Sequence, residues 1–223
     1  MSEKSSKTGH SLITKPQQKR SRQSLDAIVG ATKTLLAEKG HEGLTVPEVV
    51  VRARCSVGCF YGRFESKEAL LSYVSQQFFE EAEAGWQQFL DATRWENAQA
   101  FSIIEEMVRN TVVCTRADEA LLRAFTLYWQ TAELDAGTRE AAARYYQRLF
   151  DGLAELLLAR RNQVSHPQPE LAVRFAIEWM DATITERLLL RTSRLNQVVM
   201  TDEELVHELT RALTCYLGIP GPA

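Results

Sequence analysis

The chain is poor in the residues that interrupt secondary structure. Its 223 residues include 11 Gly and 6 Pro, and long stretches contain neither. An all-β fold of many short strands needs frequent turns, which these two residues mostly supply. Hydrophobic residues make up 45% of the chain, enough for a real core, so disorder of the whole chain is excluded. We therefore expect an all-α protein.

Long apolar runs and paired cysteine motifs are also absent. No uncharged apolar stretch reaches the ~18 residues of a membrane span, and the first 20 residues are polar. We expect no membrane span, no secretory signal and a cytoplasmic protein. The four cysteines show no CxxC spacing and the four histidines are scattered. The sequence thus predicts neither a metal site nor a disulfide framework, and no cofactor.

The sequence lacks the motifs of the common enzyme classes. It contains no GxSxG, no HExxH, no P-loop and no dinucleotide-binding glycine fingerprint. It also lacks a cluster of His, Asp and Cys that would form a nucleophile and its base. We therefore do not expect an enzyme.

Charge is distributed unevenly along the chain. Residues 1–67 hold 12 Lys and Arg against 6 Asp and Glu, whereas residues 68–223 hold 14 against 23. The net charges are +6 and −9, and every lysine lies in the first segment. Phosphate attraction is local and is screened beyond about 10 Å. A basic segment joined to an acidic one therefore favours an anionic polymer held at one end, although a solvated charged surface would give the same pattern.

The first 70 residues contain an arm and three short helical patterns. Residues 1–20 are polar and aperiodic, which predicts a disordered basic arm. Apolar residues then recur at helical spacing from Leu25 to Gly40. A capping box at Thr45 predicts a second helix of about eight residues. Ser56 would cap a third helix, from Val57 to Arg63.

The remaining periodic stretches are longer. A helix capped at Ser66 is expected to run to about Leu90 without a linker, and five more follow. Their approximate limits are 96–115, 118–132, 136–162, 169–191 and 202–217. The sequence thus predicts about nine helices, in an amino-terminal domain of residues 21–67 and a larger domain of residues 68–223.

Two short helices joined by a tight turn in the basic segment indicate a helix-turn-helix. The second short helix would enter the major groove of DNA, which is about 12 Å wide. Three runs of residues then carry a resemblance: IVGATKTLLAEKG (28–40), LTVPEV (44–49) and SVGCFYGRFESKEALL (56–71). Their order and spacing closely resemble the DNA-binding region of the TetR family of repressors, over about 45 residues.

The resemblance implies a role for individual residues. Thr45, Tyr61 and Lys67 would contact phosphates, which position a protein without selecting a sequence. Two of them, Thr45 and Lys67, stand at helix N-termini, where free N–H groups favour anions. The start of the third helix would meet base edges, and a nearby arginine would reach guanine or phosphate. These residues are Val57, Gly58, Cys59 and Arg63.

The chain departs from the family pattern at several positions. Arg54 stands in the turn where the family usually has Gly, which implies a conformational cost. Val50 replaces a usual Ala, and Val57 and Cys59 replace usual polar residues on the DNA-facing side. Cys55 and Cys59 admit a redox role, although small packed or surface residues are the simpler interpretation. The operator sequence does not follow from the resemblance.

Aromatic residues gather in the second domain, where the family encloses a small molecule. The clustering predicts a pocket for an effector that is largely apolar. Arg123 and Glu178 fall among apolar neighbours and would orient a polar group of the ligand, or lie at a solvated edge. The candidate ligand-binding residues are Met107, Arg123, Phe125, Tyr128, Trp129, Tyr146, Glu178 and Trp179.

The stretch from Leu171 to Leu190 is apolar almost all round, so one core cannot cover it. With the last helix it is expected to form a two-fold, four-helix interface, the same helices that the resemblance implies for dimerisation. The candidate interface residues are Phe175, Met180, Ile184, Leu188, Leu205, Leu209, Leu213 and Tyr216.

The function predicted from these features is a dimeric DNA-binding transcriptional regulator. A ligand-released repressor of a palindromic operator is the first hypothesis, with activation left open. A helical protein-binding adaptor that has lost DNA binding is the alternative. The expected partners are an operator in double-stranded DNA, a small-molecule effector and a second copy of the chain.

Overall fold

A computed structural model describes residues 14–131, 134–191 and 198–221, and these ranges contain helices and no strands. Single turns of 3-10 helix (η1, Ala92–Trp95; η2, Arg161–Gln163) and a π-helical turn (η3, Thr185–Leu190) join longer helices. The predicted all-α class with about nine helices is confirmed for this part of the chain. The α-helices are α1 (Thr14–Gly43), α2 (Val46–Arg52), α3 (Val57–Tyr61), α4 (Lys67–Leu90), α5 (Ala100–Ala117), α6 (Glu119–Thr131), α7 (Ala136–Leu158), α8 (Pro169–Ile184) and α9 (Asp202–Leu217).

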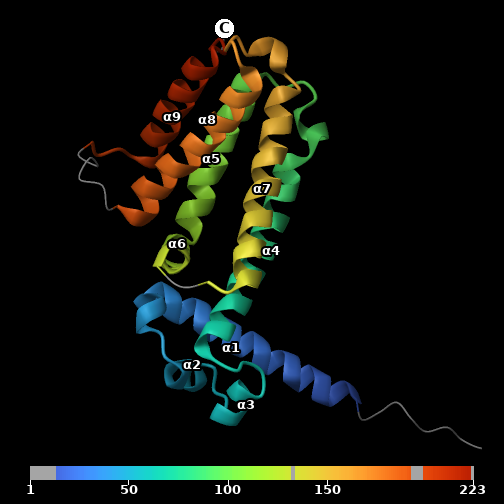
Figure 1. Cartoon of the computed structure of the whole chain (residues 1–223), viewed down its shortest axis with the longest axis vertical. Helices are drawn as coiled ribbons and strands as arrows, with labels where there is room; N and C mark the ends of the chain where they lie inside the picture. Colours follow the sequence, from blue (N-terminus) through green and yellow to red (C-terminus); the bar gives the residue numbers. More distant parts are fainter. Residues whose placement is uncertain (1–13, 132–133, 192–197, 222–223) are drawn as a thin grey trace, which may run out of the picture.

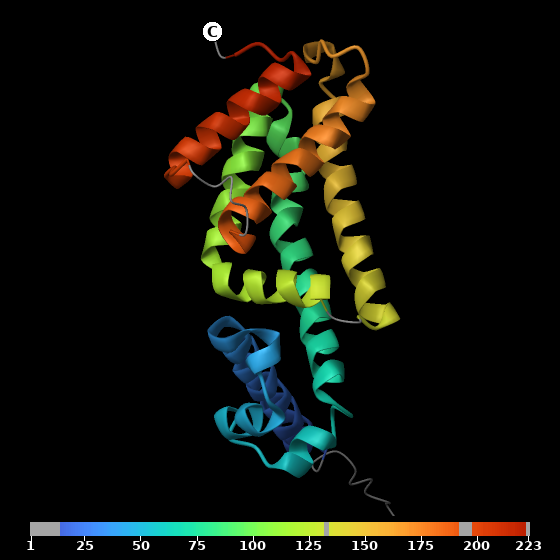
Figure 2. The ribbon, with the colours of Figure 1, turned by 60° about the vertical axis from the view of Figure 1, so that its left-hand side comes forward.

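The molecule has a small head and a long helical body (Figure 1). Helices α1, α2 and α3 form the head with the first turns of α4, and α4 continues from the head into the body without a break. The body is built from the upper part of α4 with α5, α7, α8 and α9. Helix α6 lies across the molecule between the two parts (Figure 2). None of the described helices is long and apolar enough to cross a membrane.

Helix α1 begins earlier than the sequence indicated. It starts at Thr14, so the expected arm of residues 1–20 is wrong for residues 14–20, while residues 1–13 lie outside the described residues. The predicted stop at Gly40 is present as a break in the helix. Gly40 has φ 71°, a left-handed conformation that interrupts the helix and that glycine adopts without a steric penalty. One more turn follows before α2.

Two of the three predicted caps have the expected form. The Ser56 hydroxyl accepts a hydrogen bond from the Cys59 N–H, and the Ser66 hydroxyl accepts one from the Ala69 N–H. The predicted capping box at Thr45 is wrong. Thr45 precedes α2 but its hydroxyl donates to the Glu48 carboxylate at 2.9 Å, and its side chain accepts no N–H. The same Glu48 carboxylate also forms an ion pair with Lys39.

The apolar side chains form two separate cores, one in the head and one in the body. The core of the head is not confined to residues 21–67. Leu70, Leu71 and Val74 of α4 complete it, and Ala124, Phe125 and Tyr128 of α6 are buried in it as well. Burial of apolar area is the main force that holds such contacts together. One face of α6 therefore belongs to the head, although α6 lies far along the sequence.

Candidate functional site

Helix α3 presents its start to solvent. The side chains of Val57 and Tyr61 are 54% and 55% exposed, and Gly58 is exposed, whereas Phe60 is fully buried beneath them. Cys59 is half-buried. A helix anchored by one aromatic residue and open on the opposite face has the form needed to lie in a groove. Four of the predicted DNA-contacting residues thus lie on or beside one accessible surface.

The predicted phosphate-contacting residues flank this surface. Thr45 is exposed just before α2, and Lys67 is the first residue of α4. The Lys67 ammonium donates to the backbone carbonyl of His41 at 3.2 Å, which ties α4 to the end of α1 and leaves further donor positions on the ammonium. Both residues stand at helix N-termini, where N–H groups and the helix dipole attract anions.

Arg63 has a different setting from the one the sequence indicated. Its guanidinium donates to the carbonyl and thiol of Cys59, and also to the carbonyl of Ser21 and the hydroxyls of Ser21 and Ser24. These contacts join the loop after α3 to α1. With its donors directed into the protein, Arg63 ties α3 to α1 and does not project into solvent as the predicted contact with a base requires.

The turn between α2 and α3 carries backbone strain. Arg54 has φ 51°, a conformation that favours glycine. This agrees with the conformational cost expected where the family pattern has Gly. The Arg54 side chain is exposed beside the DNA-facing surface. The thiol of neighbouring Cys55 has a raised pKa because it is partly buried, which disfavours the reactive thiolate.

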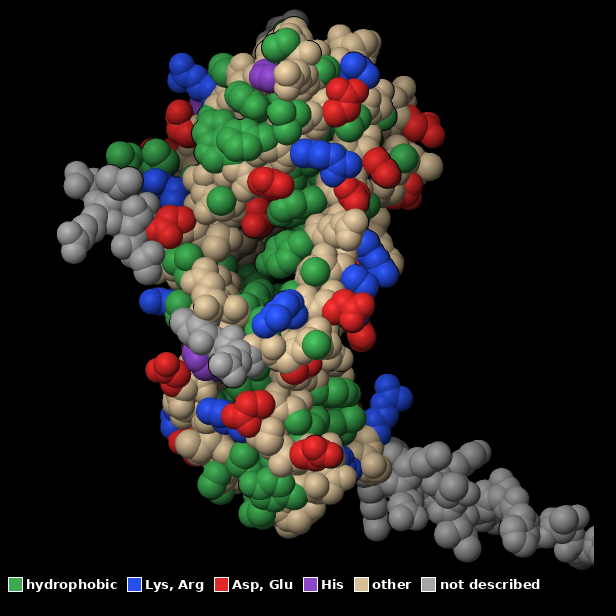
Figure 3. Space-filling view, viewed as in Figure 1, with side chains coloured by type: hydrophobic (Ala, Val, Ile, Leu, Met, Phe, Trp, Pro, Cys, Tyr) green, Lys and Arg blue, Asp and Glu red, His purple; other side chains and the backbone are tan. Residues whose placement is uncertain are grey.

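The body encloses a cavity of about 560 Å³. Helices α4, α5, α6, α7 and α8 supply most of its lining, the π-helical turn η3 adds Thr185 and Leu189, and α1 contributes Lys33. The face seen in Figure 3 is hollowed between α7 and α8, and hydrophobic side chains line the hollow. The volume suits a drug-sized molecule.

The cavity includes some of the predicted ligand-binding residues and omits others. Trp129 and Tyr146 line it. Phe125 and Tyr128 are buried in the head core, and Met107 is buried in the body core. Arg123, Glu178 and Trp179 are exposed and contribute nothing to its wall. The predicted residues lie on helices that border the cavity. Successive side chains of a helix point in directions about 100° apart, so only some of these residues reach the cavity wall.

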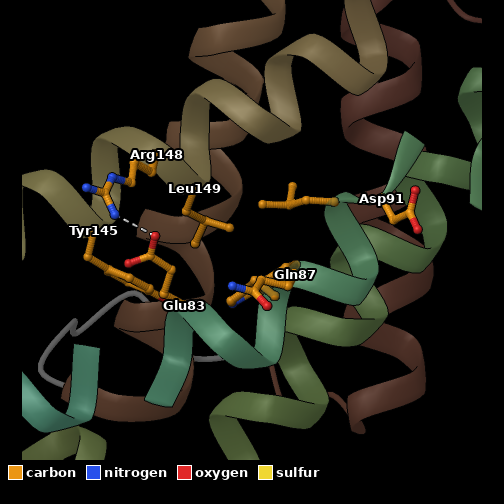
Figure 4. A pocket seen from close by; sticks show the side chains of 8 residues that line it. Glu83, Gln87, Asp91, Tyr145, Arg148 and Leu149 are labelled. Carbon is orange, nitrogen blue, oxygen red and sulfur yellow. Dashed lines mark hydrogen bonds and ion pairs between the residues drawn. The ribbon is translucent and has the colours of Figure 1, made fainter. Parts of the chain in front are cut away.

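A smaller cavity of about 230 Å³ adjoins the first, between α4 and α7 (Figure 4). Tyr145 and Leu149 of α7 line both cavities. Glu83 and Arg148 form an ion pair of 2.7 Å at its edge, drawn as a dashed line in Figure 4. This pair joins α4 to α7 beside the larger cavity.

The comparisons with known proteins agree with this geometry. Residues 28–74 match the family model of the bacterial regulatory proteins of the tetR family. This segment contains α2, α3 and the flanking parts of α1 and α4. Over these residues the chain is similar to the regulators of that family. No curated protein sequence matches the chain significantly.

Solved structures of TetR-family regulators share the fold over most of the chain. A putative regulator from Mesorhizobium loti MAFF303099 has 17% identity and a TM-score of 0.66, covering 89% of this chain and 97% of that one. A regulator from Haloarcula marismortui ATCC 43049 has 16% identity and a TM-score of 0.63, covering 89% and 97%. FadR from Bacillus subtilis, solved in complex with stearoyl-CoA, has 15% identity and a TM-score of 0.61, covering 86% and 97%.

One apolar surface of the chain lies on α8 and α9. Leu171, Phe175 and Trp179 follow one face of α8 and are exposed, and the Tyr216 ring of α9 lies 5.7 Å from Phe175 and 6.2 Å from Trp179. Figure 3 shows hydrophobic side chains gathered over these two helices. We call Leu171, Phe175, Trp179 and Tyr216 the α8–α9 apolar face.

Most of the predicted interface residues lie elsewhere. Only Phe175 and Tyr216 belong to the α8–α9 apolar face. The other six are at most 5% exposed because they pack into the chain's own core, which leaves no side-chain surface for a partner. Helix α8 does carry a second apolar face, which is formed by the exposed side chains of Leu171, Phe175 and Trp179; that a partner covers it stays a prediction. The six buried residues are Met180, Ile184, Leu188, Leu205, Leu209 and Leu213.

Sequence reasoning missed the polar part of the cavity wall. Asp181 of α8 and Asn110 and Asp118 at α5 line it, together with Lys33 from the head. The sequence offered only a weak signal, because Asp181 is one of two acidic residues, with Glu178, in the mostly apolar run from Ala176 to Ile184.

Proposed function

We propose that the protein is a ligand-released repressor that binds a palindromic operator as a dimer. Each copy would place α3 in the major groove, and Thr45, Tyr61 and Lys67 would contact the phosphates on either side. Gly58 and the small side chains of Val57 and Cys59 would meet base edges, with thymine methyl groups as the natural partners of an apolar side chain.

The dimer would form through the α8–α9 apolar face. An exposed group of three large apolar side chains on one helix, continued by a tyrosine on the next, is a feature of protein interfaces. A two-fold axis through this face would pair α8 and α9 with their copies and set two heads on the same side of the dimer. The two copies of α3 would then meet half-sites about 34 to 36 Å apart, or a multiple of that spacing.

The observation that carries the proposal is the double role of α6. Phe125 of this helix is fully buried in the head core, while Trp129, one turn later, lines the cavity. The two rings are stacked, with centroids 5.5 Å apart and planes 8° apart. A molecule that displaces Trp129 therefore acts on a side chain that packs directly against the head.

The head and the cavity are also joined through α1 and α4. Lys33 of α1 and Glu81 of α4 both line the cavity and form an ion pair of 2.6 Å. Phe79 of α4 stacks on Trp129 at 4.8 Å. A ligand that prefers one arrangement of these contacts would shift the population toward heads that no longer match the operator. A coupling of ~1 to 3 kcal/mol would weaken DNA binding ~5- to 150-fold.

The test is a binding titration of the full chain on the DNA upstream of its own gene, followed by gel shift or fluorescence anisotropy. Steep salt dependence is expected, with a slope magnitude of ~6 to 10, because phosphate contacts release counterions. The double variant Tyr61→Phe, Lys67→Ala should lose at least ~10-fold in affinity. Tyr73→Phe is the matched control, since this hydroxyl bonds to Gln77 within α4.

Two outcomes would overturn the proposal. Unchanged affinity of the double variant at moderate ionic strength would show that this surface does not hold DNA. If no duplex from a random library binds the wild type at all, the adaptor hypothesis replaces the repressor hypothesis. Release by ligand is tested separately: an effector that binds the free and the operator-bound dimer equally would rule out the repressor mechanism.

A further inference from the structure

The cavity of the body contains a carboxylate without a partner. Asp181 lies on α8 and lines the cavity, and within the described part of the chain it forms no hydrogen bond and no ion pair. Burial alone raises its pKa to about 6. Asp181 is partly buried, and a charge withdrawn from water without a compensating protein group lowers stability.

The other charged groups around the cavity do not compensate Asp181. Lys33, the one cationic residue among the lining residues, is already paired with Glu81. Asp118 adds a second acidic group at the end of α5. The charges of Lys33 and Glu81 offset each other, so the carboxylates of Asp118 and Asp181 leave the cavity wall with a net negative charge. The electric field of this wall attracts cations.

The remaining wall is aromatic and apolar. Trp86, Tyr145, Tyr146 and Phe150 line it together with Trp129, whose indole N–H is buried and has no acceptor among the described residues. Aromatic faces stabilise organic cations through their quadrupoles, most strongly where water is excluded. An unpaired donor in the same wall is a second polar group that a ligand would satisfy.

We propose that this cavity binds an amphipathic organic cation, a protonated amine whose nitrogen pairs with Asp181 and whose apolar body lies among the aromatic residues. The inference rests on the proposed function, in which the cavity is the effector site. It narrows the predicted effector, which the sequence described only as largely apolar. It also separates this chain from the stearoyl-CoA complex of FadR, because that ligand carries phosphate groups and the lining charges here would repel them.

The test compares three ligands of matched size by isothermal titration calorimetry on the full chain: biphenyl-4-ylmethylamine, biphenyl-4-ylmethanol and biphenyl-4-carboxylate. We expect the amine to bind ~10- to 100-fold more tightly than the alcohol at pH 8, and the carboxylate to bind weakest. In Asp181→Asn the amine should lose that advantage while the alcohol changes less than about twofold.

Asp151→Asn is the matched control. It makes the same chemical change on α7, where the Asp151 carboxylate pairs with Arg174 outside the cavity. The amine should keep its advantage in this variant. Circular dichroism of both variants checks the fold, and a second cavity variant, Tyr146→Ala, should weaken all three ligands together by removing aromatic wall.

The outcomes separate this inference from the proposed function. Tighter binding of the alcohol or the carboxylate, or an amine preference that survives in Asp181→Asn, would overturn the cation site while leaving DNA binding and ligand release intact. If the wild type prefers the amine but the amine does not change operator binding, the result supports the cation site and shows that this site does not control release from the operator.

Discussion

Replacing Asp181 by Asn should make the unliganded protein more stable at pH 8. The folded-state pKa of Asp181 is about 6, against an ordinary value of 3.8. The folded chain therefore binds a proton more tightly than the unfolded chain does. Between pH ~4 and ~6 stability falls as pH rises, and above pH 6 the full cost of the buried charge is present.

The size of this cost follows from the two pKa values. A difference from 3.8 to about 6 corresponds to at most ~3 kcal/mol above pH 7. Because Asp181 is only partly buried and an amide in its place also loses hydration, we expect a gain of ~1 to 2 kcal/mol for Asp181→Asn. For a chain of this length that raises the melting temperature by ~2 to 8 °C.

The assay is thermal unfolding of wild type and variant at pH 8 and pH 5, without ligand. The gain should be largest at pH 8 and should shrink at pH 5. Titration of the neighbouring groups does not account for the expected difference between pH 5 and pH 8. Burial raises the pKa of Tyr145 to about 12 and also raises the pKa values of Tyr146 and Cys114, so all three side chains stay uncharged between pH 5 and pH 8. The charged lining residues Asp118, Glu81 and Lys33 are present in both the wild type and the variant. An equal effect at both pH values, or a loss at pH 8, would refute the reasoning.

Three further predictions concern the interface and the head. Phe175→Asp should convert a dimer to a monomer in light scattering at micromolar concentration, whereas Val113→Asp, a control at an exposed apolar position on α5, should not. Arg63→Ala should lower stability by ~1 to 3 kcal/mol in urea titrations, because it removes charged hydrogen bonds between the loop after α3 and α1; an unchanged midpoint would show that these bonds are unimportant. Arg54→Gly should raise stability by ~0.5 to 1 kcal/mol by relieving a left-handed conformation, and lower stability would contradict that account.

The helices of this protein were largely predictable because their signals are local. Ser56 and Ser66 cap the helices they were expected to cap, and α4 ends at Leu90 as its apolar period indicated. The capping box at Thr45 was wrong because the Thr45 hydroxyl donates to the Glu48 carboxylate and accepts no backbone N–H. Lys39, nine residues before Glu48, also pairs with that carboxylate, a contact that the sequence within one turn does not contain.

The positions of the sites were less predictable than the helices. The exposed start of α3 followed from the helix-turn-helix pattern, but the role of Arg63 depended on Ser21 and Ser24, about 40 residues away. The apolar character of α8 indicated two covered faces. It did not indicate which residues form each one, because Leu, Ile, Phe and Trp satisfy either face equally well.

Asp181 shows how a misfit in a pattern can locate a site. Of the three acidic residues of α8, Asp181 is the one that lines the cavity, and burial raises its pKa without an ion pair to a cation among the described residues. The same carboxylate lines a cavity that is also lined by Trp129, whose ring is stacked on Phe125 of the head core. On the proposed mechanism, a cation that pairs with Asp181 would gain binding energy by relieving a cost of the empty state, and Trp129 would transmit the change to the head.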